Sequence, residues 1–272
     1  MIRRTILSVI FPFVFVFVLQ AQYSNQQFEL TYPSGISEEN KTFVETMIPE
    51  IIQANNEVLW VREKIERISG RFESDNHVTT SSLQYLQKIS RNYKTSFEFS
   101  IYTTPEQFRR QIRQLLIRVD KVPEELVLAQ AVLESEWGRS RFAAEGNNFF
   151  GIRCFKPGCG IVPEGAENQS FMVRAYDTPL DGIRDYLYNL NVGSTYRDFR
   201  AERARQRQED RFPETLKLAE TLHGYSEIGS EYFTRLSWLI RRKLPAIELT
   251  AFETPYDVNV SSTNSMSSLT DL

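Results

Sequence analysis

Hydrophobic residues recur at spacings of three and four along most of the chain, which is the period of an amphipathic helix. This spacing predicts a long helix over 37–68, ended by Gly70, and a second helix over 80–93. Thr104, with Gln107 three residues later, is typical of a helix start, because each side chain can bond to the backbone N–H of the other. The N-terminal part of the chain is therefore expected to be all helix.

The middle of the chain changes to short runs of β-branched and aromatic residues. These runs, at 149–155, 160–162 and 171–176, are separated by Gly, Pro and Asn and predict short strands. A helix over 123–137 precedes them. Helical spacing returns afterwards in three segments, at 178–190, 214–222 and 231–243.

Two polar stretches lack the amphipathic pattern. Residues 200–211 are dense in alternating charge, which predicts a helix face in contact with solvent. Seven of the twelve residues from 261 to 272 are Ser or Thr, a composition that predicts a disordered tail.

The first 21 residues have the pattern of a secretory signal. Arg3 and Arg4 precede a run over 6–19 in which 12 of 14 residues are apolar, and Ala21 is a small residue suited to cleavage. The run is short for a membrane span, which needs about 20 residues, and it contains Pro12. We expect an exported protein of the periplasm or cell envelope. The alternative is an uncleaved segment, which would be the chain's single link to a membrane.

Composition excludes several classes of protein. The 272 residues are 41% hydrophobic and 25% charged, which fits a globular chain and excludes collagen-like and wholly disordered ones. With 32 basic and 35 acidic residues there is no cationic surplus to hold a phosphate backbone, so no nucleic-acid partner is expected. Two Cys and two His leave little material for a metal site, and we expect no metal and no cofactor.

Cys154 and Cys159 flank a Lys-Pro-Gly turn. In an exported protein this pattern predicts a disulfide that pins a tight hairpin, worth about 2 kcal/mol for so short a loop. A redox or metal pair is the alternative, but the spacing is not C-x-x-C and no His lies nearby.

Glu134 is an anomaly in the helix over 123–137. It continues the face of Val127 and Ala131, where a carboxylate is costly unless it is paired or protonated. It also lies in the last turn, at the negative end of the helix dipole. Burial and dipole both raise the pKa of a carboxyl group, which a general acid at neutral pH requires. The alternative is a structural glutamate paired with Arg139 or Arg141.

The surrounding motifs resemble a known family. The segment A-Q-A-V-L-E-S-E-W-G at 129–138 is similar to the A-Q-x-x-x-E-S-x-W-G signature of bacterial β-N-acetylglucosaminidases, glycoside hydrolase family seventy-three. The E-G-N-N-F-F-G segment at 145–151 matches the N-x-F-G element of that family. The C-x-x-x-x-C-G hairpin at 154–160, the run at 188–191 and the segment at 196–200 resemble the Bax-type members.

The resemblance implies an α+β, predominantly α, fold: a lysozyme-like helical domain with a small β-hairpin lobe, preceded by an N-terminal helical region. We therefore divide the chain into a signal peptide (1–21), an N-terminal helical region (22–118), a glucosaminidase domain (119–246) and a disordered tail (247–272).

The resemblance also implies a peptidoglycan hydrolase that cleaves the β-1,4 bond after N-acetylglucosamine, with Glu134 as general acid. Its partner would be the glycan strand, and we expect a monomer. One alternative is a muramidase or lytic transglycosylase on the same fold, and another is a non-catalytic wall-binding protein. Without Arg3 and Arg4 the chain has 30 basic and 35 acidic residues, so long-range attraction to an anionic wall is not expected to drive binding.

The sequence offers two candidates for a second catalytic carboxylate. Glycoside hydrolysis ordinarily uses a base or nucleophile opposite the acid. Glu164 and Glu167 lie in the loop before the last strand, and we assign this role to Glu167. A substrate-assisted route, with the 2-acetamido group as nucleophile, is also open.

Aromatic and amide residues complete the predicted site. The resemblance makes Tyr225 a cleft residue, and Tyr196 and Phe150 are candidates to stack on sugar rings. Asn148 either fixes a sugar amide or ties its loop to the helix. Trp137 and Phe149 could also stack on sugar rings, but their helical and loop positions favour the core, and we assign them there.

Overall fold

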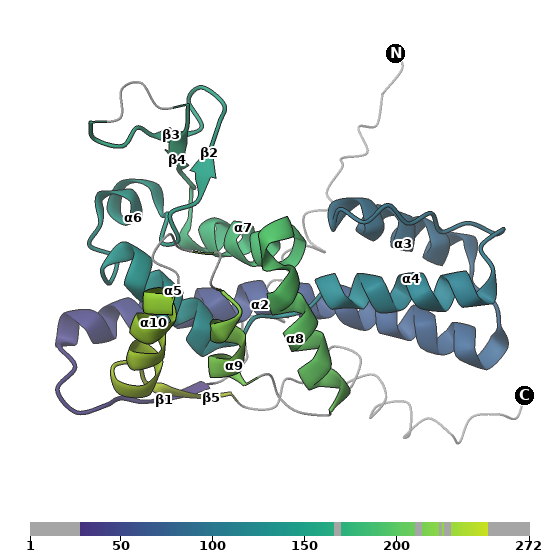
Figure 1. Ribbon diagram of the computed structural model, residues 1–272, viewed down its shortest axis with the longest axis horizontal. Helices are drawn as coiled ribbons and strands as arrows, with labels where there is room; N and C mark the ends of the chain where they lie inside the picture. The colour runs from purple at the N-terminus through teal and green to yellow at the C-terminus, as the bar shows by residue number, and fades with distance from the viewer. Residues whose placement is uncertain (1–27, 166–169, 210–213, 223–224, 226–229, 250–272) are drawn as a thin grey trace, which may run out of the picture. The chain divides into compact units, whose positions relative to one another are not determined.

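The computed structural model describes residues 28–165, 170–209, 214–222, 225 and 230–249 (Figure 1). The predicted signal segment, most of the predicted tail and Glu167 lie outside these residues. The chain forms two compact units. In one of them, strand β1 (Phe28–Thr31) pairs with β5 (Ala246–Leu249) in a two-stranded sheet. The other, Tyr32–Ala246, holds the helices and is described below.

Helix α2 (Glu38–Asp75) is the longest element and lies beneath most of the other helices in Figure 1. Ser37 caps its start by accepting a hydrogen bond from the backbone N–H of Asn40. The predicted end at Gly70 is wrong. The helix continues because Phe72 is buried beyond that glycine, and it ends only at Asn76, which adopts a left-handed conformation with φ 51°.

The C-terminal half of α2 packs against α3 (Thr80–Asn92) and α4 (Pro105–Arg118). Their shared apolar cluster includes Ile65, Phe72, Leu86, Phe108 and Leu115. The predicted capping box at the start of α4 is confirmed.

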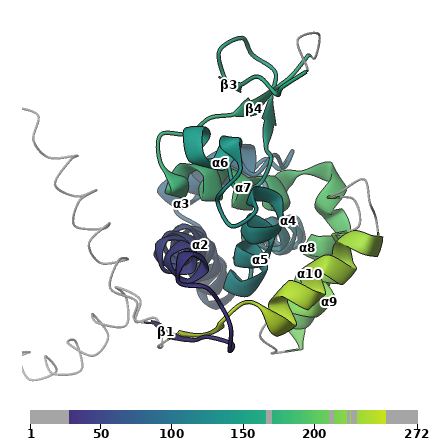
Figure 2. The ribbon, with the colours of Figure 1, turned by 90° about the vertical axis from the view of Figure 1, so that its left-hand side faces the viewer.

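The N-terminal half of α2 packs against the second group of helices. This group comprises α5 (Glu124–Ser135), α6 (Arg141–Gly146), α7 (Pro179–Val192), the 3₁₀ turn η1 (Ser194–Tyr196), α8 (Arg197–Gln208), α9 (Thr215–Glu220) and α10 (Ser230–Arg242). Figure 2 looks nearly along α2 and shows α5 enclosed between α2 and α10. Nearly every side chain of α5 is buried, which fixes the helix that carries Glu134.

A small lobe of three strands stands on these helices, at the upper left of Figure 1. Strands β2 (Arg153–Cys154), β4 (Met172–Arg174) and β3 (Gly160–Ile161) form an antiparallel sheet in that order. Gly160 is required there, because a Cβ atom would lie 1.9 Å from the carbonyl oxygen of Val173. A disulfide joins Cys154 to Cys159, as the sequence predicted.

These elements confirm the predicted class, a predominantly α fold with a small antiparallel lobe and a preceding helical region. The boundary at 118/119 remains a prediction. Among the described residues, no helix combines the length and apolarity needed to cross a bilayer.

The interpretation of residues 200–211 as a solvent-exposed face is wrong for one side of α8. Arg200, Arg203 and Gln206 are buried. The guanidinium of Arg203 donates to the backbone carbonyls of Asp120 and Lys121 at 3.0 Å each. Arg200 donates to the carbonyls of Leu190 and Gly193 at the end of α7. One face of this highly charged helix therefore belongs to the core and satisfies buried backbone carbonyls.

Candidate active site

Glu134 lies at the end of α5, where the chain turns sharply. The three residues from 136 to 138 all have left-handed backbone conformations, with φ of 54°, 61° and 77°. The Ser135 hydroxyl donates to the carbonyl of Ala131 at 2.6 Å and accepts from the N–H of Gly138 at 2.8 Å. This turn ends the helix immediately after Glu134.

The same turn packs on α2. A Cβ atom at Gly138 would lie 2.8 Å from the ring of Phe43, so the close approach needs glycine. The ring centroid of Phe43 lies 6.2 Å from that of Trp137 and 5.9 Å from that of Phe149. Neither Trp137 nor Phe149 lines the pocket described next, which agrees with their assignment to the core.

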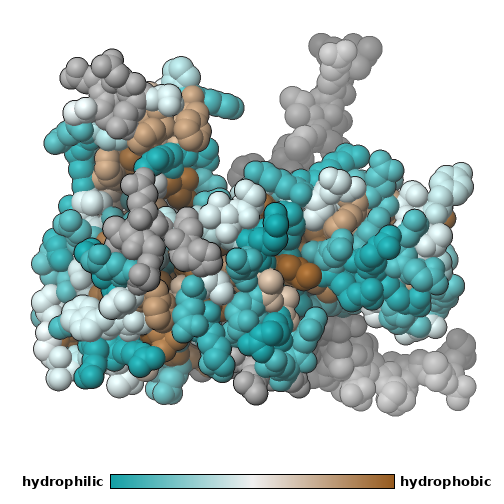
Figure 3. All heavy atoms as spheres, in the orientation of Figure 1, coloured by the Kyte–Doolittle hydropathy of each residue, from teal (hydrophilic) through white to brown (hydrophobic). Residues whose placement is uncertain are grey.

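Glu134 lines a pocket of about 1190 Å³ between the helices and the β lobe. Its walls come from α5, α7, the β lobe and the turn after α3. They include Lys94, Phe150, Arg153, Phe155, Lys156, Arg174, Asp185, Tyr188, Tyr196 and Tyr225. Figure 3 shows apolar side chains gathered over the β lobe, whereas the surface of α3 and α4 is largely hydrophilic. Charged, polar and aromatic side chains thus line the same pocket.

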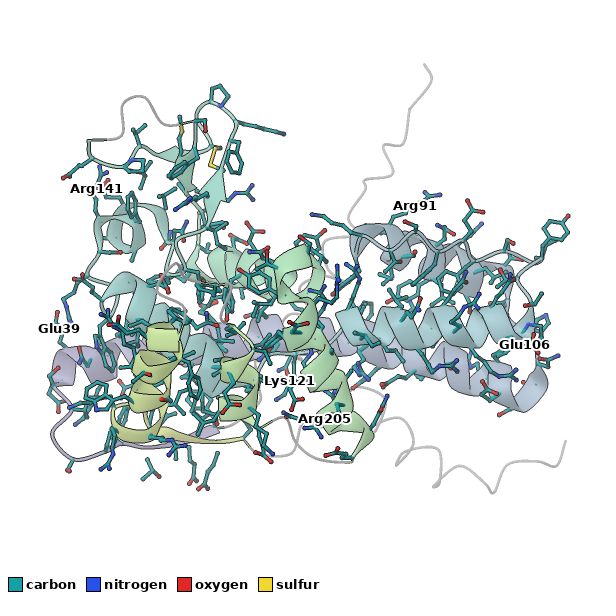
Figure 4. The ribbon with its side chains drawn as sticks, viewed as in Figure 1. Glu39, Arg91, Glu106, Lys121, Arg141 and Arg205 are labelled. Atoms are coloured by element: carbon teal, nitrogen blue, oxygen red, sulfur yellow. A yellow bond between two sulfur atoms is a disulfide. The ribbon has the colours of Figure 1, made fainter. Side chains whose placement is uncertain are left out.

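The Glu134 side chain is exposed at the pocket, where the sequence predicted a buried face. Its carboxyl group is still partly desolvated by neighbouring protein atoms. Burial raises its pKa, and a hydrogen bond from Tyr232 partly offsets the rise. The alternative of a structural ion pair is wrong for the described residues. Arg139 instead lies near Glu39, and Arg141 reaches the β lobe (Figure 4).

A chain of hydrogen bonds behind the pocket holds Glu134. Tyr186 donates to Oε1 of Gln130, and Nε2 of Gln130 donates to the hydroxyl of Tyr232 at 2.8 Å. Tyr232 then bonds to Glu134. Because the Tyr232 oxygen accepts from Gln130, its own proton is available to the Glu134 carboxyl group. Sequence reasoning missed Gln130 and Tyr186, although Gln130 is part of the A-Q motif.

Tyr225 and Tyr196 share the pocket with Glu134, as predicted. Burial, and then the negative charge of Glu134, raise the pKa of the Tyr196 hydroxyl, and the same two causes act on Tyr225 beside neighbouring tyrosines. The Tyr225 hydroxyl donates to the Phe150 carbonyl at 3.0 Å, which ties the C-terminal part of the chain to the loop before β2.

Two predicted sugar contacts are changed by the structure. Phe150 lines the pocket but is only 3% exposed, because its ring stacks on Tyr186 with centroids 4.0 Å apart. Asn148 does not line the pocket. Its amide donates to the carbonyls of Ile152 and Arg174 and accepts from the N–H groups of Phe150 and Ile152. Asn148 therefore ties its loop to the β lobe and has no free group for a sugar.

The described residues contain one further carboxylate in the pocket, Asp185 on α7. It accepts hydrogen bonds from Arg174 and Tyr176, each at 2.8 Å. Glu164 does not line the pocket and lies 3.8 Å from Arg141 on the exposed side of the lobe. Glu167 lies outside the described residues, so its assignment stays a prediction. Asp185 was missed because its helix spacing marks it only as a polar position.

Metal chemistry has no candidate in the described part of the chain. No three His, Cys, Asp or Glu side chains there are grouped to hold an ion.

Replacing Tyr232 by Phe is expected to move the pH dependence of activity. The hydrogen bond from Tyr232 lowers the pKa of Glu134, so its loss raises that pKa further. An acid with a higher pKa stays protonated to higher pH, and the alkaline limb of kcat/KM shifts upward. Tyr225→Phe, which keeps the bond to Glu134, should leave the limb in place. A limb at the same pH in both variants would contradict the assignment of Glu134.

Residues 110–242 match the family model "Glucosaminidase: Mannosyl-glycoprotein endo-beta-N-acetylglucosaminidase". The chain is 29% identical to Protein bax of Escherichia coli (strain K12) over 201 residues, which are 74% of this chain and 68% of that protein. No solved structure matches significantly. The matched segment runs from α4 to α10 and contains Glu134 with most of the pocket wall.

Proposed function

We propose that this chain, a glucosaminidase-domain protein similar to Protein bax, is a peptidoglycan hydrolase that cleaves the β-1,4 bond after N-acetylglucosamine. Glu134 is the proposed general acid. The observation that carries the proposal is a carboxyl group at the end of a buried helix, open to a large pocket, with a raised pKa.

The proposed reaction begins with Glu134 protonated. Its proton passes to the glycosidic oxygen as the bond from that oxygen to the sugar C1 breaks, leaving an oxocarbenium-like centre. In a direct route, a base takes a proton from water, whose oxygen bonds to C1. In a substrate-assisted route, the acetamido oxygen bonds to C1 first and closes a new five-membered ring. Water then bonds to C1 and opens that new ring. Glu134, now a carboxylate, accepts the water proton in that second route.

The reaction needs a second group opposite Glu134, which is either a base from the protein or the acetamido group of the substrate. Glu167 remains our proposed base. Asp185 is a second carboxylate in the same pocket, paired with Arg174, and its negative charge would favour the positive charge that develops on the sugar ring. Arg174 and Tyr176 hold one oxygen of Asp185, which fixes its orientation.

Product analysis tests the bond that is cut. Purified sacculi are digested with the protein, reduced, and analysed by mass spectrometry. Reduced N-acetylglucosamine at the new ends is the expected result. Reduced N-acetylmuramic acid would identify a muramidase, and 1,6-anhydro ends a lytic transglycosylase. Binding to sacculi without any released fragment would support the wall-binding alternative instead.

The substrate also bears on location. Peptidoglycan lies in the cell envelope, and a domain that acts on it works there. Export directed by residues 1–21 and a monomeric state are proposals that fit this location.

A further inference from the structure

The pocket has a charge opposite to that of the whole chain. Four of the six charged side chains lining it are cationic, although the protein as a whole carries a net charge of −3. The cations are Lys94, Arg153, Lys156 and Arg174. The net charge predicts that long-range attraction does not drive wall binding, but it does not describe the local charge of the pocket.

Three of these cations have no carboxylate partner among the described residues. Arg174 pairs with Asp185 at 2.8 Å. The guanidinium of Arg153 lies 4.3 Å from the ring centroid of Phe171, and the Lys94 ammonium lies 5.6 Å from that of Tyr188. These aromatic contacts hold the cations in place without neutralising them.

The β lobe presents two of the cations. Arg153 is the first residue of β2, and Lys156 follows in the turn. The disulfide between Cys154 and Cys159 encloses Lys156, and it limits the movement of the turn that carries this side chain. Lys156 is exposed and faces the pocket beside Phe155.

The third cation comes from outside the matched segment, which begins at residue 110. Lys94 follows α3 in a left-handed turn with φ 52°. The turn is fixed to α7, because the Tyr188 hydroxyl donates to the Asn92 carbonyl at 2.7 Å. Arg118 bridges the carbonyls of Tyr93 and Val192 at 3.1 and 3.2 Å. The N-terminal helices thus complete one end of the pocket.

We propose that Lys94, Arg153 and Lys156 form an anion subsite that binds carboxylates of the peptide stems on the glycan strand. The inference rests on the proposed function and adds the substrate class, a peptide-substituted glycan. Sugars of chitin and mannose-rich glycans carry no charge, so they offer nothing to three unpaired cations. A stem peptide carries several carboxylates, and charge-assisted bonds to them from cations that line the pocket would add affinity.

The test measures equilibrium binding in the Glu134→Gln background, so that it does not depend on turnover. The probes are soluble glycan fragments with intact stems, the same fragments after amidase treatment, which keeps only the lactyl carboxylate, and chitin oligomers. Lys94→Gln and Lys156→Gln should each weaken binding of stem-bearing fragments about five-fold, and the double variant more. Binding of amidase-treated fragments and chitin oligomers should change little. Added salt should reduce the preference for stems.

Lys88→Gln is the matched control, because Lys88 is an exposed lysine of α3 that does not line this pocket. It should leave all three affinities unchanged. The inference is overturned if the double variant binds stem-bearing fragments as its parent does, or if it loses affinity equally for amidase-treated ones. Failure of the wild-type protein to cleave any substrate would overturn the proposed function alone, since the binding result stands separately.

Discussion

Glu134→Gln protein is expected to fold normally and to release no product from sacculi. Glutamine has nearly the same shape and can occupy the same position in the pocket, but it has no proton to give to the leaving oxygen. General acid catalysis contributes on the order of 10² to 10⁴ in rate, so we expect a loss of about 10³-fold or more. The release of new reducing ends over time measures it.

The adjacent glutamate supplies the control. Glu136 lies two residues later, is exposed, and does not line the pocket. Glu136→Gln makes the same chemical change and should keep wild-type activity. A wild-type rate for Glu134→Gln, or an equal loss in both variants, would show that Glu134 is not the acid. Circular dichroism of each protein separates loss of chemistry from loss of fold.

Arg203→Ala is expected to lower the free energy of unfolding by about 3–5 kcal/mol. Arg203 is fully buried and also donates to the Ile117 carbonyl at 3.1 Å and to the Asn191 side chain at 2.7 Å. Its removal leaves these buried acceptors without their donor, and it takes away one of the three arginine charges near the Asp120 carboxylate. Urea denaturation at neutral pH measures the change.

Arg205→Ala is the control from the same helix. Arg205, labelled in Figure 4, has 47% of its side chain exposed and pairs with Glu202 and Glu209 at the surface. Surface pairs contribute about 0–1 kcal/mol, so this variant should stay close to wild type. Equal destabilisation by the two substitutions would contradict a structural role for the buried side of α8.

The pH dependence of stability tests the role of Arg203 in a second way, through the pKa of Asp120. Burial alone would raise the pKa of Asp120, but the charges of Arg203, Arg62 and Arg207 outweigh it and hold the pKa below its usual range. A carboxyl with a lowered pKa stabilises the fold above its unfolded value of about 3.9, and the contribution is lost as pH falls through the folded pKa. In Arg203→Ala, the unfolding free energy should fall less between pH 7 and pH below ~4 than it does in the wild type. Unfolding curves at pH 7 and in acid measure both values.

Local chemistry made parts of the fold predictable. The capping box at Thr104 and the disulfide between Cys154 and Cys159 involve residues three and five positions apart, so the sequence holds both partners. The place of Glu134 in the last turn of its helix followed from the helical period, but its exposure to the pocket did not. The end of α2 was not predictable in the same way, since burial of Phe72 outweighs the helix-breaking tendency of Gly70.

The chain by itself determined the helical class, the hairpin with its disulfide, and the carboxyl group at the end of α5, because these depend on short-range spacing and capping. Only the tertiary structure decided that Arg203 points inward and that Asn148 bonds to backbone groups of its loop. It also placed Lys94 in the pocket of Glu134, from which it is 40 residues away in sequence. Burial and charge at these positions depend on partners from distant segments, such as Asp120 for the cations of α8 and Tyr188 for Lys94. No period in the sequence encodes such partners, since they meet only when the helices pack.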